Sequence, residues 1–156
     1  MKAIQFTTSL LFFWIKGQVE IDSRFVKTNV SNTILGFIPA GKDQQSIPLK
    51  NISGAILSTK FNIKAIIIGL ILAFIGLGQM GTEFFIGFIL FIIGLLIAAN
   101  GILTTLSIEK SGTPYFISVP FFEKAKMQNL SNDIHNALAQ DTDKTDLNLF
   151  FEQKTQ

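Results

Sequence analysis

The most pronounced feature of the hydrophobic pattern is a pair of apolar runs within residues 65–103. Residues 65–82 carry no charge, and after Glu83 the next charged residue is Glu109. About 20 predominantly apolar residues are enough for a helix to cross the roughly 30 Å hydrocarbon core of a bilayer. The pattern therefore predicts a two-helix transmembrane hairpin over residues 61–103, with helices at about 64–78 and 84–103. The alternative, a buried hairpin, is disfavoured because so short a chain cannot cover two helices that are apolar on all sides.

The distribution of basic residues predicts the orientation of this hairpin. All thirteen Lys and Arg residues lie outside residues 65–109. Lys60 and Lys64 precede the first run and Lys110 follows the second, whereas the connecting turn has no basic residue. Basic residues close to membrane crossings are retained on the cytoplasmic side. We therefore expect a two-pass protein of the cell membrane with both termini in the cytoplasm.

Small residues recur on both predicted helices at spacings of four and seven. Such spacing places them on one helix face, where they let helix backbones approach closely. We interpret this face as the seam of the hairpin or of an oligomer, although glycine is also generally common in membrane helices. Asn100, near the cytoplasmic end of the second run, is interpreted as an interfacial residue. The seam residues are Gly69, Ala73, Gly76, Gly87, Gly94 and Gly101.

The segments on either side of the hairpin have the alternating pattern of strands. Residues 1–60 contain several such segments, and residues 104–110 and 115–119 form a further pair around a turn at Gly112. From Phe122 onward the apolar period becomes helical. We therefore predict an α+β membrane protein in which residues 1–60 and 104–139 form one cytoplasmic domain, interrupted by the hairpin. Residues 140–156 are predicted to be a polar tail.

This organisation resembles the bacterial pleckstrin-homology-like membrane proteins. The matching residues are the run 46–49 (SIPL) followed by Ile52, then Ser107-Ile108, the turn at Gly112, and a last helix bearing Leu130, Ile134 and Leu138. The resemblance covers residues 18–139. It implies an antiparallel sheet or open barrel of about seven strands, capped by a C-terminal helix. It also implies a non-enzymatic domain for protein or membrane contact that often self-assembles. Many family members place their membrane helices before the domain, whereas here the hairpin interrupts it.

The sequence contains no recognisable catalytic or metal-binding set. There is no cysteine and a single histidine, His135, so neither a disulfide nor a zinc site is expected. A nucleophile elbow, a phosphate-binding loop and a complete calcium loop are all missing from the sequence. The basic residues are dispersed, which disfavours nucleic-acid binding. We therefore expect no enzymatic activity, no cofactor and no nucleic-acid partner.

Five residues are candidate contacts to a membrane surface. Tryptophan favours the membrane interface, and Lys and Arg are attracted to anionic head groups. Ordinary solvated charges are the alternative for the basic residues, as is a core strand for the tryptophan. The candidates are Trp14, Lys16, Arg24, Lys60 and Lys64.

Three functional hypotheses follow from these patterns. The first is a non-enzymatic, membrane-anchored scaffold or adaptor whose domain assembles with itself or binds another membrane protein. The expected partners are thus the lipid bilayer and either further copies of the chain or another membrane protein. The second is an accessory subunit, either an immunity protein against membrane-active peptides or part of a transport complex. The third, a pore-forming oligomer, is disfavoured because the runs lack charged lining residues.

Overall fold

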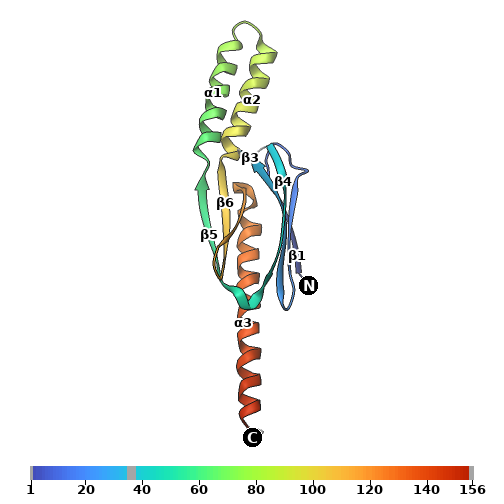
Figure 1. Ribbon diagram of the computed structural model, residues 1–156. Helices are drawn as coiled ribbons and strands as arrows, with labels where there is room; N and C mark the ends of the chain where they lie inside the picture. Colours follow the sequence, from blue (N-terminus) through green and yellow to red (C-terminus); the bar gives the residue numbers. More distant parts are fainter. Residues whose placement is uncertain (1, 35–37, 155–156) are drawn as a thin grey trace.

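The computed structural model describes the backbone of residues 2–34 and 38–154, and the side chains of residues 2–31 and 40–143. Positions 1, 35–37 and 155–156, which belong to the predicted N-terminal β part and polar tail, lie outside the described residues. The described chain forms two antiparallel sheets and three helices (Figure 1).

Both sheets are antiparallel, and the hairpin separates two strands of the second one. The first sheet has the order β1-β2-β3-β4, with β1 (Lys2–Thr7), β2 (Lys16–Ile21), β3 (Phe25–Ile34) and β4 (Ile38–Pro48). The second has the order β5-β6-β7, with β5 (Ile52–Phe61), β6 (Ile102–Lys110) and β7 (Tyr115–Pro120). Two short 3-10 turns, Leu49–Asn51 and Phe121–Glu123, connect these strands to the elements that follow them.

Strand β5 leads into the helical hairpin and β6 leads out of it. The hairpin consists of α1 (Ile63–Gln79) and α2 (Phe84–Asn100). Its two ends are held together by the β5–β6 ladder, in which Lys60 is opposite Leu103 and Phe61 is opposite Ile102. The hairpin therefore extends directly from one end of the second sheet (Figure 1).

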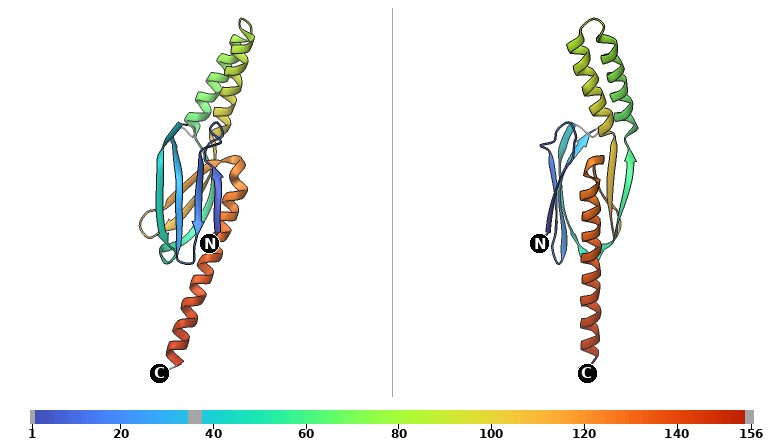
Figure 2. Two further views of the ribbon diagram at one scale, coloured as in Figure 1. Left: turned by 90° about the vertical axis from the view of Figure 1, so that its right-hand side faces the viewer. Right: turned by 180° about the vertical axis from the view of Figure 1, so that it is seen from behind.

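Residues from before and after the hairpin form one hydrophobic core. Val19 and Val26 of the first sheet, Ile117 of the second, and Leu130 and Ile134 of the last helix are all fully buried in it. This last helix, α3 (Lys124–Lys154), begins between the two sheets and continues past the end opposite the hairpin (Figures 1 and 2). Burying both flanks in one core is what places the hairpin and the β1–β2 connection at the same end of the molecule.

The prediction of a transmembrane hairpin is wrong, and with it the membrane-protein fold class and the two-pass location in the cell membrane. No helix in the described part of the chain has the length and apolarity needed to cross a membrane. Helices α1 and α2 have 17 residues each, which at about 1.5 Å per residue gives about 25 Å, less than the roughly 30 Å of a hydrocarbon core. The second run is shorter than its apolar composition indicates because Ile102 and Leu103 belong to β6.

The C-terminal helix is longer than the periodicity indicates. Residues 140–154, interpreted from the sequence as a polar tail, continue α3 as helix to Lys154. Among the described side chains of α3, Met127, Leu130 and Ile134 are buried in the core, and Ala137 and Leu138 pack against it. The apolar stripe therefore identifies residues that pack against the core but does not give the length of the helix.

Candidate interaction surface

The hairpin helices pack so closely that their backbones touch at four glycines. A Cβ atom built on Gly69 would lie 2.4 Å from the backbone nitrogen of Ala98, and one on Gly94 would lie 2.4 Å from that of Ala73. Equivalent approaches occur at Gly76, opposite Phe91, and at Gly87, opposite Met80. A side chain larger than hydrogen at these positions would force the helices apart, because the obstacle is backbone and cannot rotate away.

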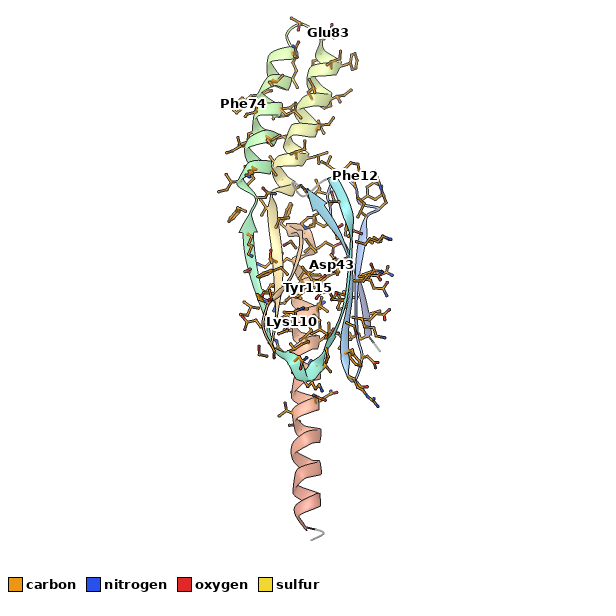
Figure 3. The ribbon with its side chains drawn as sticks, viewed as in Figure 1. Phe12, Asp43, Phe74, Glu83, Lys110 and Tyr115 are labelled. Atoms are coloured by element: carbon orange, nitrogen blue, oxygen red, sulfur yellow. The ribbon has the colours of Figure 1, made fainter. Side chains whose placement is uncertain are left out.

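This close packing directs the large side chains of the hairpin outward. The α1 residues that face α2 are small: Ala65, Gly69, Ala73 and Gly76 are its buried residues. Phe74 on α1 is 70% exposed and Phe85 on α2 is 80% exposed, and Figure 3 shows Phe74 pointing away from the neighbouring helix. Contiguous exposed apolar surface of this kind is typical of a binding interface.

Exposed large apolar residues cover the outward sides of both hairpin helices, and some of them form rows at helical spacing. On α1 they include Ile67, Leu70, Ile71 and Phe74, and on α2 they include Phe85, Phe88, Ile89, Ile92 and Leu96. On each helix these positions form a stripe separate from the glycine face. We call these two stripes the outer stripes.

The base of the hairpin is tied to the β-domain by two asparagines. The backbone amide of Asn62 donates to the carbonyl of Gly101 at 2.8 Å, and the Asn62 side chain accepts from the amide of Ala65 at 3.3 Å. Asn100, which is fully buried, accepts through Oδ1 from the backbone amide of Leu10 at 3.0 Å. The β1–β2 connection is thereby fixed against the end of α2. Gly101 adjoins this junction, where an added Cβ would lie 2.5 Å from Cγ1 of Ile66.

The β1–β2 connection carries exposed aromatic side chains at the base of the hairpin. The amide of Thr8 donates to the carbonyl of Ile15 at 3.1 Å, which closes the connection into a loop. At its tip Trp14 makes edge-to-face contacts with Phe12 and Phe13, at centroid distances of 5.2 and 5.1 Å. Trp14 and Phe13 are mainly exposed, and Figure 3 shows Phe12 beside the hairpin base.

The structure brings four of the five predicted membrane-surface residues to this end of the molecule. Trp14 and Lys16 lie in and just after the loop, Lys60 lies at the end of β5, and Lys64 lies in the first turn of α1. The Nζ atom of Lys60 lies 4.4 Å from the ring centroid of Phe116. Arg24 is at the opposite end, in the β2–β3 turn, where its carbonyl accepts from the amide of Leu49 at 2.9 Å.

Some exposed aromatic residues at this end, including Phe61 and Phe121, were not among the sequence-based candidates. Phe61 closes β5, and Phe121 follows Pro120, which is opposite Leu103 in the ladder. Because Lys60 is opposite Leu103 on the other side of β6, Phe61 and Phe121 share the hairpin end of the second sheet. Strand direction brings them there, and a single-sequence pattern does not reveal it.

A cluster of polar side chains lies between the two sheets. Nζ of Lys110 donates to Oε1 of Gln45 at 2.8 Å and lies 5.9 Å from the ring centroid of Tyr115. Burial raises the pKa of the Tyr115 hydroxyl above its ordinary value, with Thr28 lowering it and the Asp43 carboxylate raising it further. Figure 3 shows Asp43, Tyr115 and Lys110 in the space between the two sheets. The arrangement joins the two sheets, because Gln45 and Asp43 belong to β4 and Lys110 and Tyr115 belong to β6 and β7.

The remaining candidate chemistry of the described side chains is limited. Among them no group of three or more metal-ligating residues occurs. His135 is an exposed residue of α3. Glu123 is buried, and it accepts from the backbone amide of Thr7 at 2.9 Å and from Nζ of Lys126 at 3.0 Å. This carboxylate connects β1 to the start of α3.

Comparison with known proteins found no matching family model, no matching curated protein and no matching solved structure. The resemblance to the bacterial pleckstrin-homology-like membrane proteins is therefore not supported. The described chain has two antiparallel sheets and a C-terminal helix, but neither a family match nor a membrane-crossing helix accompanies them. The short run 46–49 and the turn at Gly112 reflect ordinary strand and turn chemistry.

Proposed function

We propose that this chain is a non-enzymatic scaffold that assembles with further copies of itself through the outer stripes of its helical hairpin. The proposal rests on how side chains of different size are distributed on the hairpin. Small residues occupy the space between α1 and α2, and large apolar residues face outward. The β-domain does not need this surface, since its own core is complete without any residue of the hairpin.

The outer stripes have the form of helix-packing surfaces. Ile67, Leu70, Ile71 and Phe74 recur at three- and four-residue intervals, the spacing at which side chains of one helix interlock with those of another. A second hairpin placed alongside would cover such a stripe on each copy. An interface that uses the same patch on both copies closes as a symmetric dimer, and a head-to-tail arrangement closes as a ring.

Copies lying side by side with their hairpin bases at one level would hold several β-domains together. In this arrangement the loops that contain Trp14 and the ends of β5 would all face the same way. The proposed role is therefore structural. The hairpins hold the copies together, and the β-domains are left available to bind other partners. The sequence contains no recognisable catalytic motif, which supports a structural role over an enzymatic one.

Cysteine cross-linking tests self-assembly directly, because the natural chain contains no cysteine. A disulfide forms only where two Cα atoms come within about 7 Å. We expect Ile71→Cys or Phe74→Cys to give a disulfide-linked dimer in mild detergent under an oxidising catalyst. Ala73→Cys is the matched control, because Ala73 is 4% exposed and faces the neighbouring helix of its own chain.

The mass of the intact particle provides the second measurement. We expect a multiple of the 17.3 kDa chain after subtraction of bound detergent. A monomeric mass, together with no cross-link at any position of either outer stripe, would contradict the proposal.

A further inference from the structure

We propose that the end of the β-domain around the hairpin base binds a bilayer surface rich in anionic phospholipid head groups. We call this surface the basal rim. Its aromatic members are Phe13, Trp14, Phe61 and Phe121, and its basic members are Lys16, Lys60 and Lys64. The inference does not depend on self-assembly, because the rim residues lie outside the outer stripes.

The first support is that exposed aromatic side chains occur together with lysines at one end of the β-domain. Exposed Trp and Phe side chains favour the interfacial layer of a bilayer, where an apolar ring and a polar edge are both accommodated. Trp14 is 61% exposed and Phe61 is 62% exposed. Trp14 lies in the β1–β2 loop and Phe61 ends β5, so their position at the same end of the domain results from the fold.

The second support is charge complementarity. Lys60 and Lys64 flank the point where β5 passes into α1, and neither is within an ion pair found among the described side chains. Glu123, two residues after Phe121, is buried and paired with Lys126. The exposed charge of the rim is therefore positive, which favours an anionic surface.

A groove beside Trp14 adds a place where a head group fits. It has a volume of about 450 Å³ and is lined by Trp14, Ile15, Lys16, Ser31, Gly41 and Lys42. The lining thus includes two lysines, an indole ring and a serine whose hydroxyl donates to the carbonyl of Lys16 at 3.4 Å. Phosphate oxygens accept hydrogen bonds from ammonium groups, and an indole ring suits the interfacial layer next to a head group.

Competition between two vesicle populations tests the rim separately from the apolar hairpin. Full-length protein is diluted from detergent into a mixture of neutral phosphatidylcholine vesicles and vesicles containing phosphatidylglycerol, which are then separated by density. We expect the ratio of protein on anionic to neutral vesicles to fall by about fivefold for each lysine removed. Lys60→Gln/Lys64→Gln should therefore lower this ratio by about twentyfold to thirtyfold.

The matched control removes the same charge from the other end of the molecule. Arg24→Gln/Lys50→Gln should leave the ratio within about twofold, since these residues lie at the turns remote from the rim. The emission of Trp14, the only tryptophan, should shift to shorter wavelength on anionic vesicles. An equal distribution between the two vesicle types, or equal losses in the rim and control variants, would overturn the proposal. Either result would leave cross-linking in detergent, and with it self-assembly, unaffected.

Discussion

The backbone amide of Leu10 donates a hydrogen bond of 3.0 Å to Oδ1 of Asn100, a residue 90 positions later in the chain. This bond joins the β1–β2 loop, which contains the exposed aromatic residues, to the last residue of α2. Asn100 has no exposed surface, and its side chain holds the loop against the base of the hairpin. The geometry of the basal rim depends on this contact.

Replacing Asn100 should therefore loosen the rim. We expect Asn100→Ala to lower the free energy of unfolding by about 1–3 kcal/mol, because the buried amide of Leu10 loses its acceptor. The loop should also become more mobile, which the fluorescence anisotropy of Trp14 would report as a decrease. Asn129→Ala, at an exposed position of α3, is the control and should change neither quantity. An unchanged anisotropy in Asn100→Ala would show that the loop is held by other contacts.

The hairpin offers a matched pair of glycines for testing its close packing. A Cβ on Gly76 would lie 2.4 Å from the backbone nitrogen of Phe91, whereas one on Gly78 would meet nothing within 4 Å. We expect Gly76→Ala to destabilise the hairpin by about 1–3 kcal/mol through overpacking. Gly78→Ala should stabilise it by up to about 1 kcal/mol through helix propensity. Thermal unfolding followed by circular dichroism distinguishes the two, and equal effects would refute backbone contact at Gly76.

Several features of the fold could be predicted because they leave a local pattern in the sequence. The stripe of Met127, Leu130 and Ile134 indicated a packed helix, and all three residues are fully buried in the core. The turn between residues 110 and 115 was indicated by Gly112, which has a positive φ of 104°. Periodicity and turn chemistry identify such elements because their cause lies within a few residues.

Other features depend on contacts that no local pattern contains. Ile102 and Leu103 read as a continuation of an apolar helix, yet they pair with Phe61 and Lys60 as a strand. Apolar composition alone does not distinguish a helix end from the start of a buried strand. This ambiguity made the second helix too long and the transmembrane prediction wrong. The position of Arg24 at the end opposite the hairpin, and the contact between Leu10 and Asn100, likewise follow from the way the chain folds and not from a local pattern.

The buried hydroxyl of Tyr115 gives the domain a pH dependence of stability at high pH. Burial raises the pKa of this hydroxyl in the folded protein above the ordinary value of about 10. The folded state thus holds the phenolic proton more tightly than the unfolded state does. Its contribution to stability is complete below pH of about 10 and is lost as the pH rises through the folded pKa. Asp43 acts in the same direction, since its negative charge opposes a neighbouring phenolate.

Two measurements check this prediction. Tyr115 is the only tyrosine, so the ultraviolet absorbance of tyrosinate in the folded protein reports its titration directly, and the midpoint should lie above that of the urea-unfolded chain. Tyr115→Phe should cost about 0.5–1.5 kcal/mol at pH of about 8 through loss of its hydrogen bonding. The difference in stability between the natural chain and Tyr115→Phe should then shrink as the pH rises above about 10. Only the natural chain has a phenolic proton there, and its folded state binds that proton more tightly than its unfolded state. Coincident titration midpoints in the folded and unfolded chains would show that Tyr115 is not shielded from water by the two sheets.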